Sequence, residues 1–135
     1  TLTPDLYACG IDFWGPSNKF TAYAAFPSRY TKYVERCWFN PKTDSLQMHQ
    51  TSPALHADKI TAPVFIAQSA NDRRVKLEQS EQMVEALKAH DKQYEYALLH
   101  GEGHALSNEK KIIELMTRVE AFLMKHMPVT QGEDS

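Results

Sequence analysis

Cysteine, charge of one sign and long apolar runs are all scarce in this sequence, and each scarcity excludes a class of protein. The two cysteines, Cys9 and Cys37, are too few and too far apart for a disulfide framework or a zinc site, so we expect two free, mostly buried thiols. A net charge of −2 gives no reason to expect nucleic acid or anionic lipid as a partner. No apolar run approaches the roughly 18 residues of a membrane-spanning helix. The sequence carries no indication of the compartment.

What is present is the composition of an ordinary globular domain. The chain has 135 residues, of which 42% are apolar and 24% charged, and this length allows it to bury a core. We expect one folded unit over residues 1–127. Pro128 ends the last predicted helix, and residues 128–135 are expected to form a disordered tail.

Residues 63–75 are the segment around which the chain is organised. Residues 64–67 form a short apolar run after Pro63, which is typical of a strand buried on both faces of a parallel sheet. The run breaks into residues 69–72, whose short polar side chains favour a turn. Asp72 thus follows the carboxyl end of a central strand, where ligands bind in open α/β sheets. A residue that merely caps the next helix would give the same pattern.

The rest of the chain alternates between strand and helix patterns. Two more strands are predicted at residues 7–13 and 93–100, and two amphipathic helices at residues 76–90 and 109–125. Between the first two strands we expect two short helices within residues 19–38, a polar loop at 40–52 and a helical turn at 55–60. The last helix is expected to turn six apolar side chains inward: Ile112, Ile113, Met116, Val119, Phe122 and Leu123. Because strand–helix–strand units join parallel strands, the predicted fold is α/β, with three parallel strands and flanking helices.

A polar residue follows each of the last two predicted strands. Asp72 follows one and His104 the other, and neighbouring parallel strands would bring their loops together. An aspartate bonded to one imidazole nitrogen fixes the tautomer and leaves the other nitrogen free as a general base. We therefore expect a carboxylate oxygen of Asp72 within about 2.6–3.2 Å of His104 Nδ1. The alternative is a loop histidine without a role.

The motifs around these two residues resemble the prolyl oligopeptidase family of serine peptidases. The resemblance covers about residues 3–126 and is closest to bacterial acylaminoacyl or dipeptidyl peptidase-like members. It extends only over the carboxyl-terminal part of that family's α/β-hydrolase catalytic domain. The matching segments are Thr3-Pro4-Asp5-Leu6-Tyr7-Ala8, Gly15-Pro16-Ser17-Asn18, Ser52-Pro53, His56-Ala57-Asp58-Lys59-Ile60, Ala62-Pro63, Ala70-Asn71-Asp72, Arg74-Val75, Gln79-Ser80-Glu81-Gln82 and Glu102-Gly103-His104.

Three residues depart from the family pattern. Ser69 stands where glycine is usual, Arg73 where proline is frequent and Ala105 where glycine is common. None of these departures removes a catalytic side chain, although each could alter the geometry of its loop.

The resemblance implies that Asp72 is the acid and His104 the base of a catalytic triad. The family presents its nucleophilic serine on a Gly-x-Ser-x-Gly elbow, and the sequence contains no such motif. By resemblance the nucleophile belongs just upstream of Thr1. Ser17 has the correct chain order, but Lys19 stands where the elbow needs a small residue. The chain is therefore expected to be a fragment that is inactive alone and needs no cofactor.

Other candidate residues each have a structural alternative. By resemblance Phe13 and Trp14 help to line the pocket for the residue before the cut bond, and core packing is the alternative for both. Arg73 and Arg74 could hold a substrate carboxylate, or they could simply be exposed to solvent.

A metal site is not predicted. His100 and His104 have the spacing of a helical zinc motif, but Gly101 and Gly103 disfavour the helix that this motif needs.

The predicted function is hydrolysis of peptide bonds through a Ser-His-Asp triad. The alternatives are a non-catalytic interaction domain on a hydrolase scaffold, or an esterase with the same triad. We expect a peptide substrate as partner. At the free edge of the strand at residues 7–13 we expect either the rest of the parent polypeptide or a second copy of the chain. The resemblance also implies an upstream β-propeller that restricts access to short peptides.

Overall fold

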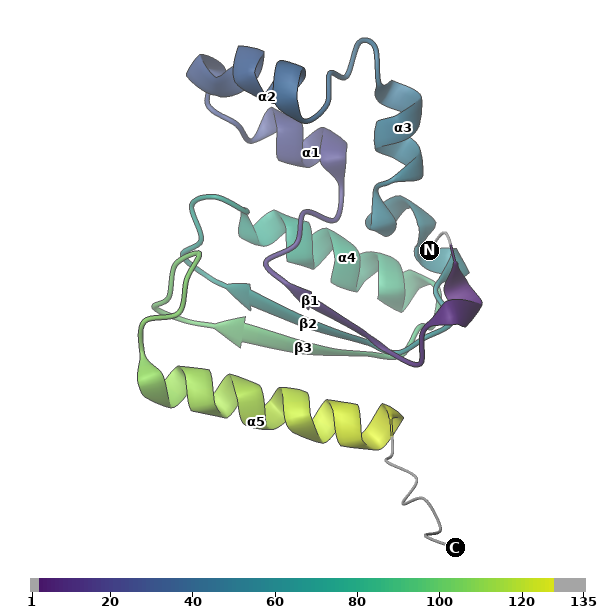
Figure 1. The fold of residues 1–135 in the computed structure, drawn as a ribbon, viewed down its shortest axis with the longest axis vertical. Helices are drawn as coiled ribbons and strands as arrows, with labels where there is room; N and C mark the ends of the chain where they lie inside the picture. Colours follow the sequence, from purple (N-terminus) through teal and green to yellow (C-terminus); the bar gives the residue numbers. More distant parts are fainter. Residues whose placement is uncertain (1–2, 128–135) are drawn as a thin grey trace, which may run out of the picture.

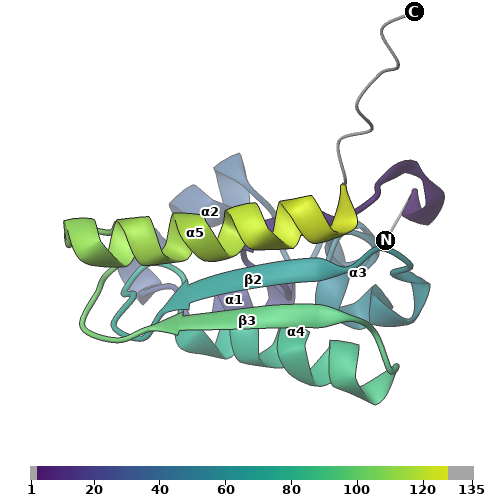
Figure 2. The ribbon, with the colours of Figure 1, turned by 90° about the horizontal axis from the view of Figure 1, so that it is seen from below.

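A three-stranded parallel sheet lies between two long helices in the computed structural model, which describes residues 3–127 (Figure 1 and Figure 2). The strands are β1 (Gly10–Phe13), β2 (Val64–Ser69) and β3 (Tyr94–Leu99), with β2 in the centre. Both strand pairs are parallel. The predicted α/β fold, with its three parallel strands and central second strand, is confirmed. The predicted tail at 128–135 lies outside the described residues.

The first strand is shorter than predicted. Residues 7–9 are not part of β1, which begins where the Gly10 N–H donates to the Pro63 carbonyl at 2.9 Å. Pro63 has no N–H group to donate, so it cannot extend the hydrogen bonds between β1 and β2 toward residues 7–9. Upstream of β1, a short 3-10 turn η1 (Pro4–Leu6) leads into Tyr7, which is exposed.

Helices α4 (Leu77–Ala89) and α5 (Glu109–His126) cover opposite faces of the sheet (Figure 2). On one face, Leu87 of α4 belongs to the same buried cluster as Ile66 of β2. On the other, Phe122 of α5 meets Phe65 of β2 edge to face, with ring centroids 5.5 Å apart. The sheet is thus the middle layer between α4 and α5. Contacts on both faces hold β2 in place and thereby position the loop that follows it.

The apolar face predicted for α5 is wrong in part. Ile112, Ile113 and Met116 are exposed, and Ile113 keeps 58% of its surface. Leu115, which the prediction omitted, is buried together with Phe122. Apolar residues occupy more of the helix circumference than the sheet can cover, so periodicity alone could not choose the face that turns inward.

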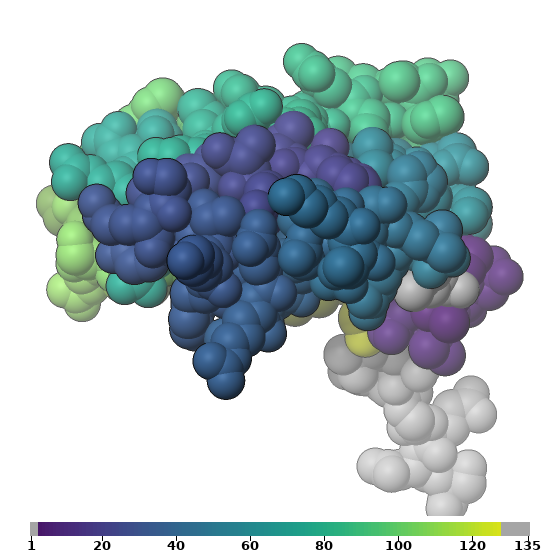
Figure 3. All heavy atoms as spheres, turned by 90° about the horizontal axis from the view of Figure 1, so that it is seen from above, coloured from purple at the N-terminus to yellow at the C-terminus, as the bar shows by residue number. Residues whose placement is uncertain are grey.

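Three short helices form a separate group, which lies above α4 in the view of Figure 1. They are α1 (Lys19–Ala24), α2 (Thr31–Cys37) and α3 (Ser45–Gln50), and they form the nearest part of the molecule in Figure 3. Their core consists of Val34, Phe39 and Met48. Two 3-10 helices complete the region, η2 (Ser28–Tyr30) before α2 and η3 (Pro53–Lys59) after α3.

The polar loop predicted at residues 40–52 is therefore wrong, because α3 lies within it. One turn and a half of helix offers a single buried side chain, Met48, which has 1% of its surface exposed. Its two apolar residues, Leu46 and Met48, are two positions apart, and this spacing does not indicate a helix.

A polar network fastens this helical group to α4. The Asn18 N–H donates to Gln79 Oε1 at 3.0 Å, and Asn18 Nδ2 donates to Gln82 Oε1 at 2.9 Å. The Lys19 N–H donates to Ser52 Oγ at 2.9 Å, which joins the start of α1 to the turn after α3. These bonds join the start of α1 both to α4 and to the turn that follows α3.

Both cysteines are free, as predicted, but the expected burial of the thiols is wrong. Cys37 is exposed and Cys9 is half-buried. In the part of the chain that the structure describes, no helix is both long and apolar enough to span a membrane.

Candidate active site

The loops that follow β2 and β3 are bonded to each other through their backbones. The Ala70 N–H donates to the Leu99 carbonyl at 2.9 Å, and the Asn71 N–H donates to the Glu102 carbonyl at 3.2 Å. The parallel pairing ends both strands at the same edge of the sheet, Ser69 opposite Leu99. The polar residues of the two loops are therefore held together by the sheet itself.

Asp72 and His104 meet between these loops. Asp72 Oδ2 lies 2.9 Å from His104 Nδ1, within the predicted hydrogen-bond range. The Asp72 side chain is fully buried, whereas 37% of the His104 side chain is exposed. Among the described residues no hydrogen bond engages His104 Nε2, which leaves that nitrogen available to a ligand.

The second oxygen of Asp72 organises its own loop. Oδ1 accepts the Arg74 N–H at 2.7 Å and the Val75 N–H at 3.0 Å. Asp72 does not cap the following helix, because the N-cap of α4 is Lys76. Asp72 instead closes the turn before that helix while its other oxygen holds His104. A single carboxylate therefore fixes both the loop and the imidazole.

Glu102 holds the loop that carries His104, a role that sequence reasoning missed. Its buried carboxylate accepts the Ser107 N–H at 3.1 Å and pairs with Lys111 Nζ at 3.3 Å. The hydrogen bond from the Ser107 backbone, together with the charge and hydrogen bond of Lys111, lowers the pKa of Glu102 below its usual value. The sequence feature that could have indicated this role is an acidic residue in a glycine-rich loop, followed by a lysine in the first turn of the next helix.

Trp14 lies near the imidazole of His104, and its own backbone conformation is strained. Its φ of 53° is in the left-handed region, which costs a bulky residue about 1–3 kcal/mol. The indole Nε1 donates to Ser69 Oγ at 2.8 Å, and the ring centroid lies 6.5 Å from that of His104. Ser69 thus supplies the acceptor that holds Trp14.

Phe13 and Trp14 are placed differently from each other. Phe13 has 37% of its surface exposed on β1, whereas Trp14 packs against the cluster beneath α5. Neither residue lines the cavity beside His104. Their predicted contact with substrate remains a prediction.

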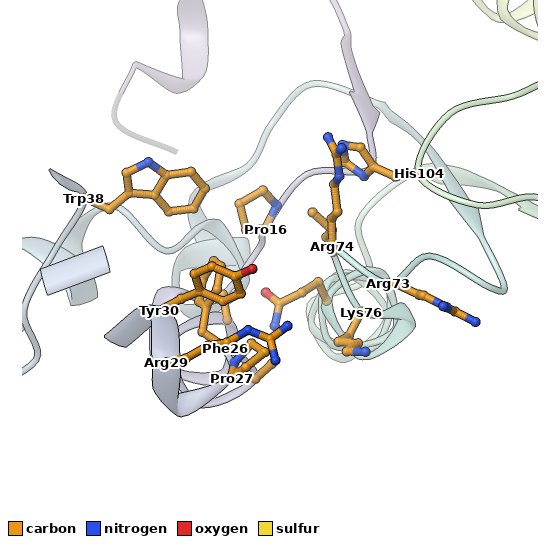
Figure 4. Close-up of a pocket in the computed structure, with 14 residues that line it drawn as sticks. Pro16, Phe26, Pro27, Arg29, Tyr30, Trp38, Arg73, Arg74, Lys76 and His104 are labelled. Atoms are coloured by element: carbon orange, nitrogen blue, oxygen red, sulfur yellow. The ribbon is translucent and has the colours of Figure 1, made fainter. Parts of the chain in front are cut away.

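A cavity of about 510 Å³ opens next to His104. One wall comes from the Asp72 loop and the start of α4, including Arg74, Lys76 and Gln79. The facing wall comes from the small helices and includes Tyr30 and Trp38. In Figure 4, Arg74 extends in the direction of His104, whereas Arg73 extends away from the aromatic side chains.

Ser17, the serine in the correct chain order, does not face His104. It is buried, with 1% of its surface exposed, and its hydroxyl donates to the Gln79 carbonyl. Within residues 3–127, no three His, Cys, Asp or Glu side chains cluster closely enough to hold a metal ion.

Comparison with known proteins places the chain in a family. The family model described as "Prolyl oligopeptidase family" matches residues 1–130. Dipeptidyl aminopeptidase BIII of Pseudoxanthomonas mexicana is 35% identical over 128 residues, which are 91% of this chain and 19% of that protein. Dipeptidyl peptidase family member 6 of Caenorhabditis elegans is 32% identical over 131 residues, 93% of this chain and 18% of that protein.

The fold also resembles that of a solved peptidase structure. A puromycin-hydrolyzing peptidase of Mycobacterium tuberculosis superposes with a TM-score of 0.81 at 22% identity, over 90% of this chain and 19% of the other. The chain thus spans about a fifth of the length of the proteins that it matches: its share is 19% and 18% of the length of the two sequence relatives. The family model matches almost the whole length of this chain, and the chain shares its sheet with a solved peptidase. This chain therefore belongs to the prolyl oligopeptidase family of serine peptidases.

Proposed function

We propose that this chain supplies the acid and the base of a Ser-His-Asp triad that hydrolyses peptide bonds. His104 takes the proton from the nucleophilic serine and later gives it to the leaving amine, and Asp72 holds the ring in the required tautomer. The serine comes from the polypeptide upstream of this chain. The substrate is a peptide, and the reaction needs no metal or cofactor.

The observation that carries the proposal is the bond between Asp72 Oδ2 and His104 Nδ1, 2.9 Å long. With Nδ1 occupied, the proton is directed to that nitrogen and Nε2 becomes the basic atom. His104 also lines the cavity, so a substrate there can reach the ring. The buried Asp72 stabilises the imidazolium that forms when His104 accepts a proton.

The first test uses a polypeptide that contains this chain and its upstream sequence. We expect a fluorophosphonate probe to label one serine covalently, and His104→Ala to reduce the labelling rate and kcat for peptide hydrolysis by about 10⁴-fold or more. His100→Ala is the matched control, because His100 is an exposed histidine four residues earlier in the same loop. It should retain both the labelling and the hydrolysis of the unchanged protein.

Equal labelling of the His104→Ala and His100→Ala proteins would contradict the proposal and favour a scaffold without a triad. The 135-residue chain by itself should hydrolyse peptides no faster than its His104→Ala variant, because covalent catalysis needs the serine. If the purified chain alone is labelled at Ser17 or another of its own serines, then the nucleophile lies within it and the proposed division of the triad is wrong.

A further inference from the structure

The cavity beside His104 is strongly positive although the chain carries a net charge of −2. Four of its lining residues are cationic: Arg29, Arg73, Arg74 and Lys76. No aspartate or glutamate lines it. Over residues 3–127 the ion pairs are His104–Asp72 and Lys111–Glu102, so none of the four cations has a carboxylate partner. Uncompensated positive charge around a concave surface attracts anions.

Arg74 is the cation whose position relative to His104 is best defined. Its backbone N–H donates to Asp72 Oδ1 at 2.7 Å, while Oδ2 of the same carboxylate holds His104. The Arg74 side chain therefore starts from a backbone that is tied to the imidazole through one residue. A guanidinium binds a carboxylate through two parallel hydrogen bonds, which a neutral amide cannot reproduce.

The start of α4 adds a second and independent attraction for an anion. Lys76 is the N-cap of this 13-residue helix, and its side chain makes no capping hydrogen bond. The first N–H groups of a helix have no partner within it and carry partial positive charge. Lys76 and Gln79 both line the cavity, so this helix end lies at its wall.

The facing wall is apolar and accessible. Tyr30 and Trp38 retain 47% and 61% of their surfaces, although both are large aromatic residues. The Arg29 guanidinium lies over the Tyr30 ring, 4.8 Å from its centroid, so charge and apolar surface occur together (Figure 4). This combination suits a group with an apolar stem and an anionic end.

We propose that the cavity binds a carboxylate of the peptide substrate close to the cleaved bond, with Arg74 as its main contact and Arg29 and Lys76 as supporting charges. The inference rests on the proposed peptidase function and names its substrate class. The carboxylate has two sources: an acidic side chain next to the cleaved bond, or the free carboxyl terminus of a short substrate. Neutral substrates of the same shape are hydrolysed less efficiently.

The test compares matched substrates on the protein that contains this chain and its upstream sequence. One pair carries Glu or Gln before the cleaved bond, and a second pair has a free or an amidated carboxyl terminus. We expect kcat/KM to be about 10- to 100-fold higher for the anionic member of at least one pair, the value of a charge-assisted hydrogen-bonded contact. The pair that shows the difference identifies the source of the carboxylate.

Arg74→Gln should abolish the difference in kcat/KM between the anionic and the neutral substrate. Arg36→Gln, an exposed change on α2 outside the cavity, should preserve it.

Calorimetric titration separates this inference from the proposed function. In the His104→Ala protein, N-acetylglutamate should bind more tightly than N-acetylglutamine amide, which has no carboxylate, and Arg74→Gln should remove that difference. If the carboxylate binds and the protein that keeps His104 hydrolyses no peptide, the proposed function is rejected and this site is supported. Equal kcat/KM within both substrate pairs, or equal binding of the two amino-acid derivatives, would overturn the inference.

Discussion

At the scale of single residues, Asp72 has two structural duties. One oxygen binds His104 and the other accepts the Arg74 and Val75 N–H groups. A substitution can remove one duty while keeping the other, because asparagine retains a carbonyl oxygen but gains an N–H₂ group. The proposed catalytic contribution of Asp72 and its structural contribution can therefore be measured separately.

Asp72→Asn should keep the fold and lose the activity. We expect the amide oxygen to remain with the loop N–H groups, so the melting temperature changes little, while kcat falls about 10⁴-fold because the ring is held in the wrong tautomer. Asp72→Ala also leaves two N–H groups without their acceptor, and should lower the free energy of unfolding by about 1–3 kcal/mol. Peptidase assays combined with urea unfolding test both statements. Comparable activity in Asp72→Asn and the unchanged protein would argue against Asp72 as the triad acid.

At the scale of elements, the site depends on how the loop between β3 and α5 is held. Glu102 connects this loop to α5 through Lys111, and Lys111 Nζ also donates to the His100 carbonyl. The backbone of Glu102 reaches the other loop, where its carbonyl accepts the Asn71 N–H at 3.2 Å. The geometry of His104 thus depends on a carboxylate that does not contact it.

Glu102 should make the stability of the fold depend on acid pH. Folding lowers the pKa of Glu102 below its ordinary value of 4.5, so the unfolded state binds more protons in that range and stability rises with pH. The contribution is fully present above about pH 4.5 and is lost as the pH falls through the lower pKa of the folded state. Glu102→Gln should therefore be less stable than the unchanged chain at pH 7 and lose stability less steeply on acidification. Urea unfolding at several pH values measures this.

The matched control for that experiment is Glu114→Gln, which changes the same charge at an exposed position of α5. It should follow the acid profile of the unchanged chain. An unaltered profile in Glu102→Gln would mean that other carboxylates account for the acid sensitivity.

At the scale of the whole molecule, β1 forms an open edge of the described sheet. Ile11 and Phe13 pair in register with Phe65 and Ala67, which lie beneath α5, yet they retain 40% and 37% of their surfaces. An apolar edge with unpaired backbone groups is a template for another strand. We propose that this edge packs against the rest of the parent polypeptide, or against a second copy when the chain is isolated.

The isolated chain should therefore associate in solution. Light scattering after size-exclusion chromatography is expected to give a mass above the 15.4 kDa of one chain. Ile11→Lys should shift the distribution toward the monomer, because a charge on an edge strand opposes strand addition. Leu46→Lys, at a position on α3 with 70% exposure and far from the edge in sequence, should leave the mass unchanged. A stable monomer of the unchanged chain would refute association through this edge.

Local sequence signals were sufficient for the order of the strands and for the contact between Asp72 and His104. The apolar run at residues 64–67 predicts a strand buried on both faces, and β2 is that strand. Turn-forming residues after it predict where Asp72 lies, and the parallel pairing predicts that His104 is its neighbour. These predictions succeed because burial on two faces and short turns each leave a pattern within a few consecutive residues.

Only the tertiary structure decided which side of α5 turns inward, the existence of α3, and the charge of the cavity. Leu115 rather than Ile113 is buried because the sheet covers one stripe of a helix that is apolar over a wider arc. Arg29, Arg74 and Lys76 come from two distant segments, and nothing in either segment indicates that they face one space. Periodicity and turn chemistry act between near neighbours, whereas the cavity depends on how the small helices pack against α4, a contact between residues about 60 positions apart.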